Sequence, residues 1–246
     1  MIISIINHTN GRISDEEFQN VIRAVNRQIE GDFAPYWGFG AQLRLEGRSQ
    51  KKPSEHRLSD MRGDAVLYVW DHIDPDAAGY HVRNDDGIPF GYVFLDLSAA
   101  LEEPWSVTLS HEALELIGDP ENNLFVAGPH PGIPRRRVFH WYEMCDAVQD
   151  ENYEIDGVRV SNFVLPLYFT PGAERGSRND FLGRKHDGKT LESFGINPGG
   201  YIGFYDPKSK KTSEHSSDKR AARRLKIKRR AKGARRSVRY SRLFLA

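Results

Sequence analysis

The first hundred residues contain short apolar runs bounded by polar loops, with one segment of helical periodicity among them. That segment begins at Ser14, which has Glu17 three residues later as in a capping box, and its apolar positions recur at helical spacing as far as Gly31. The other apolar or alternating runs are too short for helices, which favours strands. These strands are predicted at residues 2–6, 41–45, 65–70 and 90–96.

The next segment, residues 104–118, has the pattern of a buried helix. Pro104 suits the first helical position, and Gly118 followed by Pro120 ends the helix. Apolar residues lie on more than one side of this helix, so it belongs in a core. Ionisable groups in such a place are costly unless they are paired or bind a metal. The helix nevertheless carries three of them, His111, Glu112 and Glu115.

His111 and Glu115 are one helical turn apart, so their Cβ atoms lie on one face, roughly 5–6 Å from each other. One divalent ion can bridge the two side chains. Glu112 occupies the position that the general base takes in the zinc-binding motif H-E-x-x-H. The second histidine of that motif is replaced here by glutamate, whose carboxylate is an accepted zinc ligand. The added negative charge shifts the metal preference toward harder ions.

Three stretches together resemble a bacterial and phage group of zincin-like metallopeptidases. They are Ser-His-Glu-x-x-Glu-x-x-x-Asp-Pro from Ser110, Glu-Met-Cys-Asp at 143–146 and Tyr-Glu-Ile-Asp-Gly-Val at 153–158. In the last of these, the Asp-Gly pair between alternating residues also predicts a β-hairpin. The resemblance covers roughly residues 1–170, and the order of strand, helix, three strands and motif helix is also similar to zincins. It implies an α+β, zincin-like fold with a mixed twisted sheet, an N-terminal helix and a metal-binding helix.

The same resemblance implies a zinc-dependent peptidase, a hydrolase in which Glu112 takes a proton from metal-activated water and returns it to the leaving amine. The strand before the motif helix would then be a sheet edge on which an extended peptide or protein substrate pairs. Tyr92 and Phe94 would contact that substrate. The alternative is that residues 92–96 are an ordinary interior strand, and the glutamate at position 115 leaves open a non-catalytic metal site.

A catalytic zinc site usually has three protein ligands and a water molecule, and the sequence leaves the third ligand open. Glu143 would match zincins whose third ligand is a glutamate from a later element. Asp119 follows on the same helical face if the helix runs that far, and Glu121 has the spacing of the third metzincin ligand. We prefer Glu143, because the proline and asparagines after the helix would turn Glu121 outward. Two nearby residues expected to be structural or to support the ligands are His140 and Asp146.

The composition of the chain bears on the size of its hydrophobic core and on the cellular compartment. The chain has 246 residues, of which 39% are hydrophobic, enough for one sizeable core. Cys145 is the single cysteine, so no intramolecular disulfide can form. The start of the chain does not resemble a signal peptide, and no apolar run is long enough to span a bilayer. We therefore expect a cytoplasmic protein that does not act on membranes.

The net charge of +1 conceals a basic C-terminus. Residues 219–246 contain 13 Lys and Arg and no Asp or Glu, whereas all 34 acidic residues precede them. The organisation predicted from this contrast is a zincin-like domain at 1–205, a polar linker at 206–218 and a basic tail at 219–246. The pattern allows a helix in the tail between Asp218 and Gly233.

A basic tail of this kind can neutralise phosphates and bind DNA or RNA without sequence specificity. The rival hypothesis is therefore a non-catalytic protein that binds metal, or binds nucleic acid through this tail. The alternative role for the tail is docking on the protein's own acidic body. The candidate nucleic-acid contacts are Arg223, Arg224, Lys228, Arg229 and Arg230.

Overall fold

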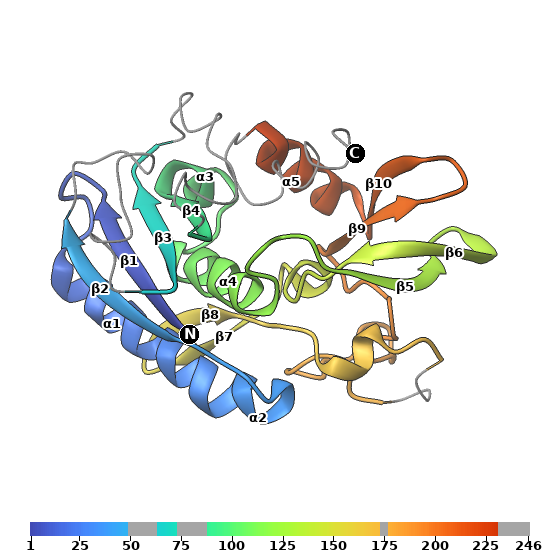
Figure 1. Cartoon of the computed structure of the whole chain (residues 1–246), viewed down its shortest axis with the longest axis horizontal. Helices are drawn as coiled ribbons and strands as arrows, with labels where there is room; N and C mark the ends of the chain where they lie inside the picture. The colour runs from blue at the N-terminus through green and yellow to red at the C-terminus, as the bar shows by residue number, and fades with distance from the viewer. Residues whose placement is uncertain (49–62, 73–87, 173–176, 231–246) are drawn as a thin grey trace.

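The structure is a computed structural model that describes residues 1–48, 63–72, 88–172 and 177–230. Two sheets lie on either side of a central helix, α4 (Trp105–Gly118), so that α4 is enclosed by the rest of the fold (Figure 1). Helices and strands both contribute to the core, and the predicted α+β class is confirmed. Among the described residues, no helix combines the length and apolarity that a membrane span requires.

The N-terminal sheet is parallel throughout and has the strand order β2-β1-β3-β4. Parallel strands are covered on both faces, which is why they read as near-continuous apolar runs rather than as alternating ones. All of β3 except Trp70 is buried. The strands are β1 (Ile2–His8), β2 (Gln42–Arg48), β3 (Ala65–Trp70) and β4 (Phe90–Phe94).

Helix α1 (Asp15–Arg27) begins as the sequence predicts, because the Ser14 hydroxyl accepts a hydrogen bond from the backbone N–H of Glu17 at 3.1 Å. The chain continues through a π-helical turn (Gln28–Phe33) and α2 (Ala34–Trp37) before it enters the sheet. A short helix that the sequence pattern did not predict, α3 (Leu95–Ala100), joins β4 to α4.

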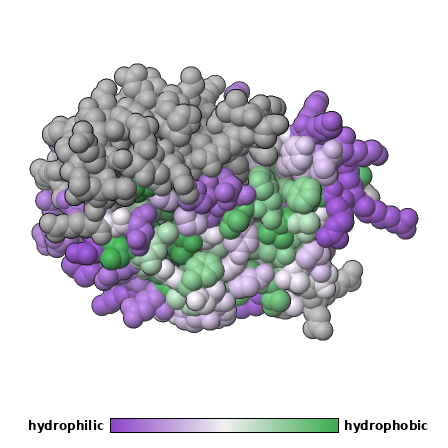
Figure 2. Space-filling view, viewed as in Figure 1, coloured by the Kyte–Doolittle hydropathy of each residue, from purple (hydrophilic) through white to green (hydrophobic). Residues whose placement is uncertain are grey.

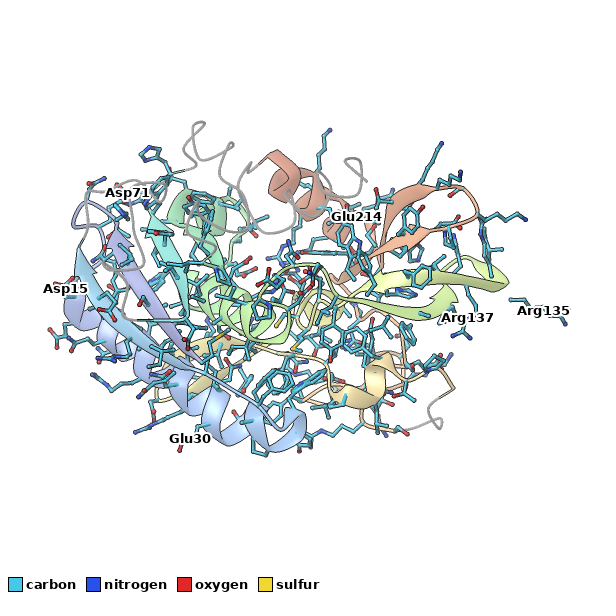
Figure 3. The ribbon with its side chains drawn as sticks, viewed as in Figure 1. Asp15, Glu30, Asp71, Arg135, Arg137 and Glu214 are labelled. Carbon is cyan, nitrogen blue, oxygen red and sulfur yellow. The ribbon has the colours of Figure 1, made fainter. Side chains whose placement is uncertain are left out.

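The second sheet is antiparallel, with the strand order β10-β9-β6-β5. Its hairpins form the hydrophilic end of the molecule, where Arg135 and Arg137 extend into solvent (Figures 2 and 3). A separate hairpin turns at Asp156 and Gly157, both with positive φ, as the Asp-Gly signal predicts. The strands are β5 (Phe125–His130), β6 (Ile133–Trp141), β7 (Asn152–Ile155), β8 (Val158–Ser161), β9 (Tyr201–Asp206) and β10 (Lys211–Ser216).

Two predictions need correction here. In place of a single mixed sheet, the described residues form a parallel four-stranded sheet, an antiparallel four-stranded sheet and the separate β7–β8 hairpin. The stretch 206–218, predicted to be a polar linker, contains β10, which pairs with β9 over its whole length. Strand β10 lies at the edge of its sheet and is partly exposed along its length, so its sequence lacks an apolar face that would have identified it as a strand.

The basic C-terminal segment begins as a helix, α5 (Lys219–Arg230), within the range that the sequence allows. Asp218 caps it, since its carboxylate accepts the N–H groups of Ala221 and Gly199 at 2.8 Å each. The side chains of Ala221, Arg224 and Leu225 are buried. The described part of the predicted tail therefore packs against the acidic body of the protein.

Candidate metal centre

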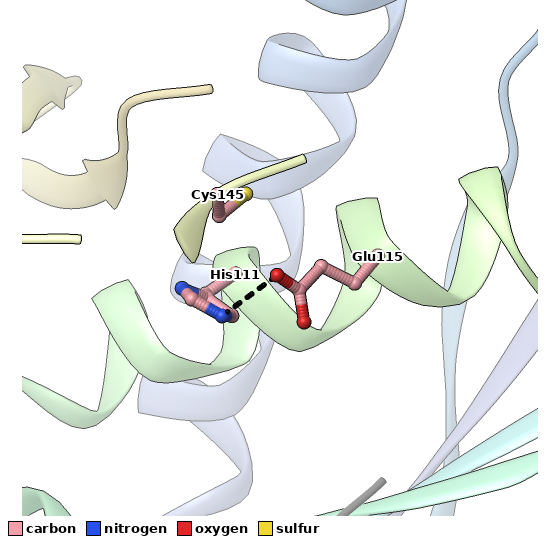
Figure 4. A group of neighbouring side chains, drawn as sticks. All are labelled: His111, Glu115 and Cys145. Atoms are coloured by element: carbon pink, nitrogen blue, oxygen red, sulfur yellow. Dashed lines mark ion pairs between the residues drawn. The ribbon is translucent and has the colours of Figure 1, made fainter. Parts of the chain in front are cut away.

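Helix α4 carries the first half of the candidate site. It packs against β4 and β8, and its apolar residues leave almost no side of the helix in solvent. His111 and Glu115 are only 2% and 5% exposed. The His111 Nε2 atom lies 3.1 Å from Glu115 Oε1, so the predicted sharing of one helical face is confirmed (Figure 4).

The second half of the site comes from the segment after β6. The side chain of Met144 packs against Gly118 at the end of α4. A Cβ atom added to Gly118 would lie 2.7 Å from the Met144 sulfur. A side chain at position 118 would require the flexible end of the Met144 side chain to move. The backbone N–H of Val164 donates to the Met144 carbonyl at 2.7 Å and fixes the segment from the other side. Cys145 and Asp146 follow directly and face α4, with Asp146 Oδ1 3.5 Å from His111 Nε2.

Three side chains of metal-ligand type converge at this junction. One donor atom from each of His111, Glu115 and Cys145 lies within 4.8 Å of the other two, and all three side chains are buried. Ligands of a tetrahedral zinc ion, at about 2.0–2.3 Å from the metal, are about 3.3–3.8 Å apart. Nδ1 of His111 is buried with no hydrogen-bond partner. This donor set fits a zinc ion after a small contraction.

Negative charge gathers around the same point. Burial, followed by the charge of Glu115, raises the pKa of the Cys145 thiol well above its usual range. The pKa of the Tyr201 phenol is raised in the same way, by burial and then by the charges of Glu115 and Glu214. Glu214 lies on β10, away from Arg135 and Arg137 (Figure 3). A divalent cation would be stabilised in this potential, and its binding would release the thiol proton.

Glu112 and Glu143 belong to the same electrostatic environment, because the charges of both also raise the pKa of Cys145. Glu112 is half-buried on α4, one position round from His111, and so remains open to water. Glu143 is buried two residues before Cys145. It is not one of the three residues whose donor atoms converge, and its role as the third ligand stays a prediction.

The alternative ligands Asp119 and Glu121 lie outside the convergent group. Helix α4 ends at Gly118, so Asp119 has left the helical face on which the prediction placed it. Its two carboxylate oxygens accept the backbone N–H groups of Asn123 and Leu124 at 3.0 Å each. Asp119 thus organises the turn after the helix, and Glu121 is half-buried within that turn.

His140 has the structural role that the sequence suggests. Its Nε2 lies 2.7 Å from the carbonyl oxygen of Pro129, and its ring centroid is 4.7 Å from that of Phe194. Burial lowers the pKa of His140 to about 4, so the imidazole is neutral at physiological pH. By contrast Asp146, which the sequence also assigned to a supporting role, approaches the imidazole of His111 directly.

The predicted substrate edge is at the end of the parallel sheet. Among the described strands, β4 pairs with β3 alone. Tyr92 and Phe94 are buried in a smaller core cluster on one face of the sheet, with their rings stacked at 5.4 Å. Contact with a peptide at this edge would therefore involve the backbone of β4 rather than these two side chains.

The predicted nucleic-acid contacts have different environments. Arg223 is exposed, whereas Arg224 is buried and forms ion pairs with Asp150 and Glu103. Arg224 is consequently occupied within the protein, because α5 packs against the body instead of extending from it. Lys228, Arg229 and Arg230 belong to α5, but their side chains lie outside the described part of the structure, as do residues 231–246.

No model of a protein family matches this chain, and no curated protein or solved structure matches it.

Sequence reasoning missed Cys145 as a candidate ligand. It considered this residue only for disulfide formation, because a thiol in an apolar run is usually part of the core. The available signal was its position between two acidic residues, Glu143 and Asp146, in a chain with no other cysteine. The distance to His111 could come only from the tertiary structure.

Proposed function

We propose that this protein is a zincin-like, metal-dependent peptidase whose centre is formed by His111, Glu115 and Cys145, with zinc as the metal. The observation that carries the proposal is the convergence of these three donor atoms within 4.8 Å inside a buried junction. Imidazole, carboxylate and thiolate are the zinc ligands found in proteins. A thiolate disfavours Mg²⁺ and Ca²⁺, which prefer oxygen ligands.

Different residues would have different roles in the proposed peptide hydrolysis. A bound divalent ion would polarise the substrate carbonyl and acidify a water molecule. Glu112 would act as the general base and then as the acid for the leaving amine, because it borders the ligands and remains half-exposed. Asp146 would orient the imidazole of His111, since a carboxylate beside a ligating histidine fixes its ring and its tautomer.

The substrate would be an extended polypeptide that pairs with the backbone of β4. This strand packs against α4 and pairs on only one side with another described strand. Addition of a strand gives affinity through backbone hydrogen bonds and requires no particular side chain from β4. The burial of Tyr92 and Phe94 is compatible with this mode of binding.

The first experiment measures metal binding by titration of chelator-treated protein with Zn²⁺ and with Co²⁺, whose absorption reports thiolate ligation. We expect one ion per chain and a loss of affinity of about 100-fold or more in His111→Ala, because a ligand is removed. His215→Ala provides the matched control, since His215 is exposed on β10. Equal affinities in the two variants would overturn the proposed centre.

The second experiment separates metal binding from catalysis. Glu112→Gln should retain the metal and lower casein hydrolysis by about 10²–10⁴-fold, the range attributed to general acid–base catalysis. Glu16→Gln, a change of the same kind at an exposed position on α1, should retain full hydrolysis. Wild-type protein that binds zinc but leaves casein and a peptide library intact would contradict the peptidase proposal and leave a non-catalytic metal site.

A further inference from the structure

The ligand set proposed above comes from two segments that are distant in sequence. His111 and Glu115 lie on α4, and Cys145 lies after β6. Residues 101–103 precede α4, and residues 149–150 follow the turn after Cys145; the two stretches meet where the Gln149 amide donates to Glu103 Oε2 at 3.1 Å. The relative position of these two stretches therefore influences how closely the ligands approach one another.

Helix α5 contacts both stretches through one arginine. Arg224 is 6% exposed. On the α4 side its Nη2 donates to the carbonyl oxygen of Leu101 at 2.8 Å and lies 3.5 Å from Glu103 Oε2. On the other side its Nη1 donates to Asp150 Oδ1 at 2.5 Å. The planar, multidentate guanidinium is suited to joining acceptors that come from different segments.

The acceptors of Arg224 are themselves connected to the centre. The other oxygen of Glu103 accepts the hydroxyl of Thr108 on α4 at 3.1 Å, and Glu103 Oε2 also accepts the amide of Gln149 at 3.1 Å. Gln149 in turn accepts the hydroxyl of Tyr201 at 3.3 Å. Through Thr108 the network contacts α4 one helical turn before His111.

We infer that α5 is a clamp for the metal centre and that Arg224 is its positioning residue. This inference rests on the proposed metal-binding function and gives a role to a basic segment that was predicted to be a tail. Arg224 fixes the start of α4 against the segment that follows Cys145. Groups that orient metal ligands from outside the ligand set typically change metal affinity by 10–100-fold when they are mutated.

Thermodynamic reciprocity gives the clamp a second consequence. If the docking of α5 improves metal binding, then metal binding must stabilise the docking of α5 by the same factor. Zinc also slows exchange that occurs by global unfolding, but a helix that only contributes to general stability would show no response in amides that exchange by local opening of α5. Hydrogen exchange of residues 219–226 with and without zinc therefore distinguishes a clamp from a purely structural helix.

The test compares Arg224→Met with Arg223→Met in the full chain. The two substitutions remove the same charge from adjacent positions of one helix, but Arg223 is exposed. We expect Co²⁺ affinity to fall at least tenfold in Arg224→Met and to remain unchanged in Arg223→Met. We also expect zinc to slow exchange in α5 of the wild type and of Arg223→Met, and to have no effect there in Arg224→Met.

The outcomes separate this inference from the proposal on which it depends. Equal Co²⁺ affinities in the two variants, or exchange in α5 that does not respond to zinc, would overturn the clamp and leave the metal centre in place. Failure of the wild type to bind zinc or Co²⁺ would overturn both. If Arg224→Met does not fold, Arg224→Lys replaces it, because a lysine satisfies only part of the acceptor set; an affinity equal to wild type would again overturn the clamp.

Discussion

Two clusters in this protein combine a histidine with a buried carboxylate, and they differ in how their polar atoms are satisfied; His186 of the first is partly exposed, whereas His111 of the second is buried. In the first, Glu151 accepts hydrogen bonds on both oxygens: Oε1 is 2.6 Å from His186 Nε2 and 2.8 Å from the amide of Asn197, and Oε2 is 2.6 Å from the amide of Asn162. One carboxylate thus meets three donors. This arrangement is a satisfied hydrogen-bond network with a structural role, and we call it the Glu151 network.

In the cluster on α4, the imidazole of His111 has carboxylate oxygens of Glu115 and Asp146 at 3.1 and 3.5 Å, with the thiol of Cys145 beside them. Here several potential ligands converge on one imidazole, and Nδ1 of that ring has no hydrogen-bond partner. The comparison teaches that a histidine paired with a buried glutamate does not by itself indicate a metal site. The convergence of further ligand-type atoms is what distinguishes the second cluster.

His140 shows that an unpartnered ring nitrogen and the convergence of ligand-type atoms are independent features. Its Nδ1 is also buried without a hydrogen-bond partner, yet its ring lies between those of Phe194 and Phe204 rather than among ligands. A neutral imidazole with one N–H bonded to a carbonyl can leave its other nitrogen unused at a modest cost. An unpartnered nitrogen therefore does not by itself indicate a metal site, and at His111 the carboxylates of Glu115 and Asp146 approach Nε2 rather than the unpartnered Nδ1.

The largest expected effect concerns the Glu151 network. Glu151→Ala removes the acceptor for the histidine and for two buried amides, and should lower the free energy of unfolding by about 3–5 kcal/mol. Urea unfolding of chelated protein measures this loss. Zinc stoichiometry at 25 °C should be unchanged. A variant that lost its zinc while keeping wild-type stability would reverse the roles that we assign to the two clusters.

The next effect concerns the identity of the third ligand. Cys145→Ala should lower zinc affinity at least tenfold, about 1.4 kcal/mol, and should cost little stability in chelated protein because a small apolar side chain replaces a protonated thiol. Glu143→Gln is the matched test of the ligand that the sequence favoured. If Glu143→Gln lowers the affinity and Cys145→Ala does not, the carboxylate is the ligand and the thiol belongs to the core.

Local patterns explain which features could be predicted. The capped helix from Ser14, the buried strand at 65–70 and the Asp-Gly hairpin each depend on neighbours in sequence, and the structure confirms all three. The pairing of His111 with Glu115 was predictable for the same reason, since helical geometry alone brings them together.

Features that depend on tertiary context could not be predicted in this way. Strand β10 has no apolar face because much of the strand is exposed to solvent. Arg224 has the same sequence context as the exposed Arg223, and its burial depends on Asp150 and Glu103, which the fold brings to one place. The approach of Cys145 to α4 is likewise a product of the fold, in which the neighbouring Met144 packs against Gly118.

Another effect concerns the pH dependence of stability that arises from His140, whose Nε2 lies next to a backbone carbonyl rather than a carboxylate. Its pKa is about 4 in the folded protein and about 6.5 when unfolded, so between these values only the unfolded chain binds the proton. Stability should therefore fall as pH decreases from 6.5 to 4, by roughly 2–3 kcal/mol for this group. His140→Gln should flatten that part of the profile measured by urea unfolding, whereas the exposed-site variant His215→Gln should leave the slope as in wild type.

The smallest effect concerns Asp218, a surface carboxylate satisfied by backbone N–H groups. Hydrogen bonds from Ala221 and then Gly199 lower the pKa of Asp218, so its contribution to stability is present above the unfolded pKa and is lost as pH falls through the folded value. Asp218→Ala should weaken the start of α5 by about 1 kcal/mol and speed hydrogen exchange there. Asp218→Asn keeps an oxygen that can cap the helix and should retain most of that protection without its pH dependence. Equally fast exchange in both variants would show that the charge, and not the cap, holds α5 in place.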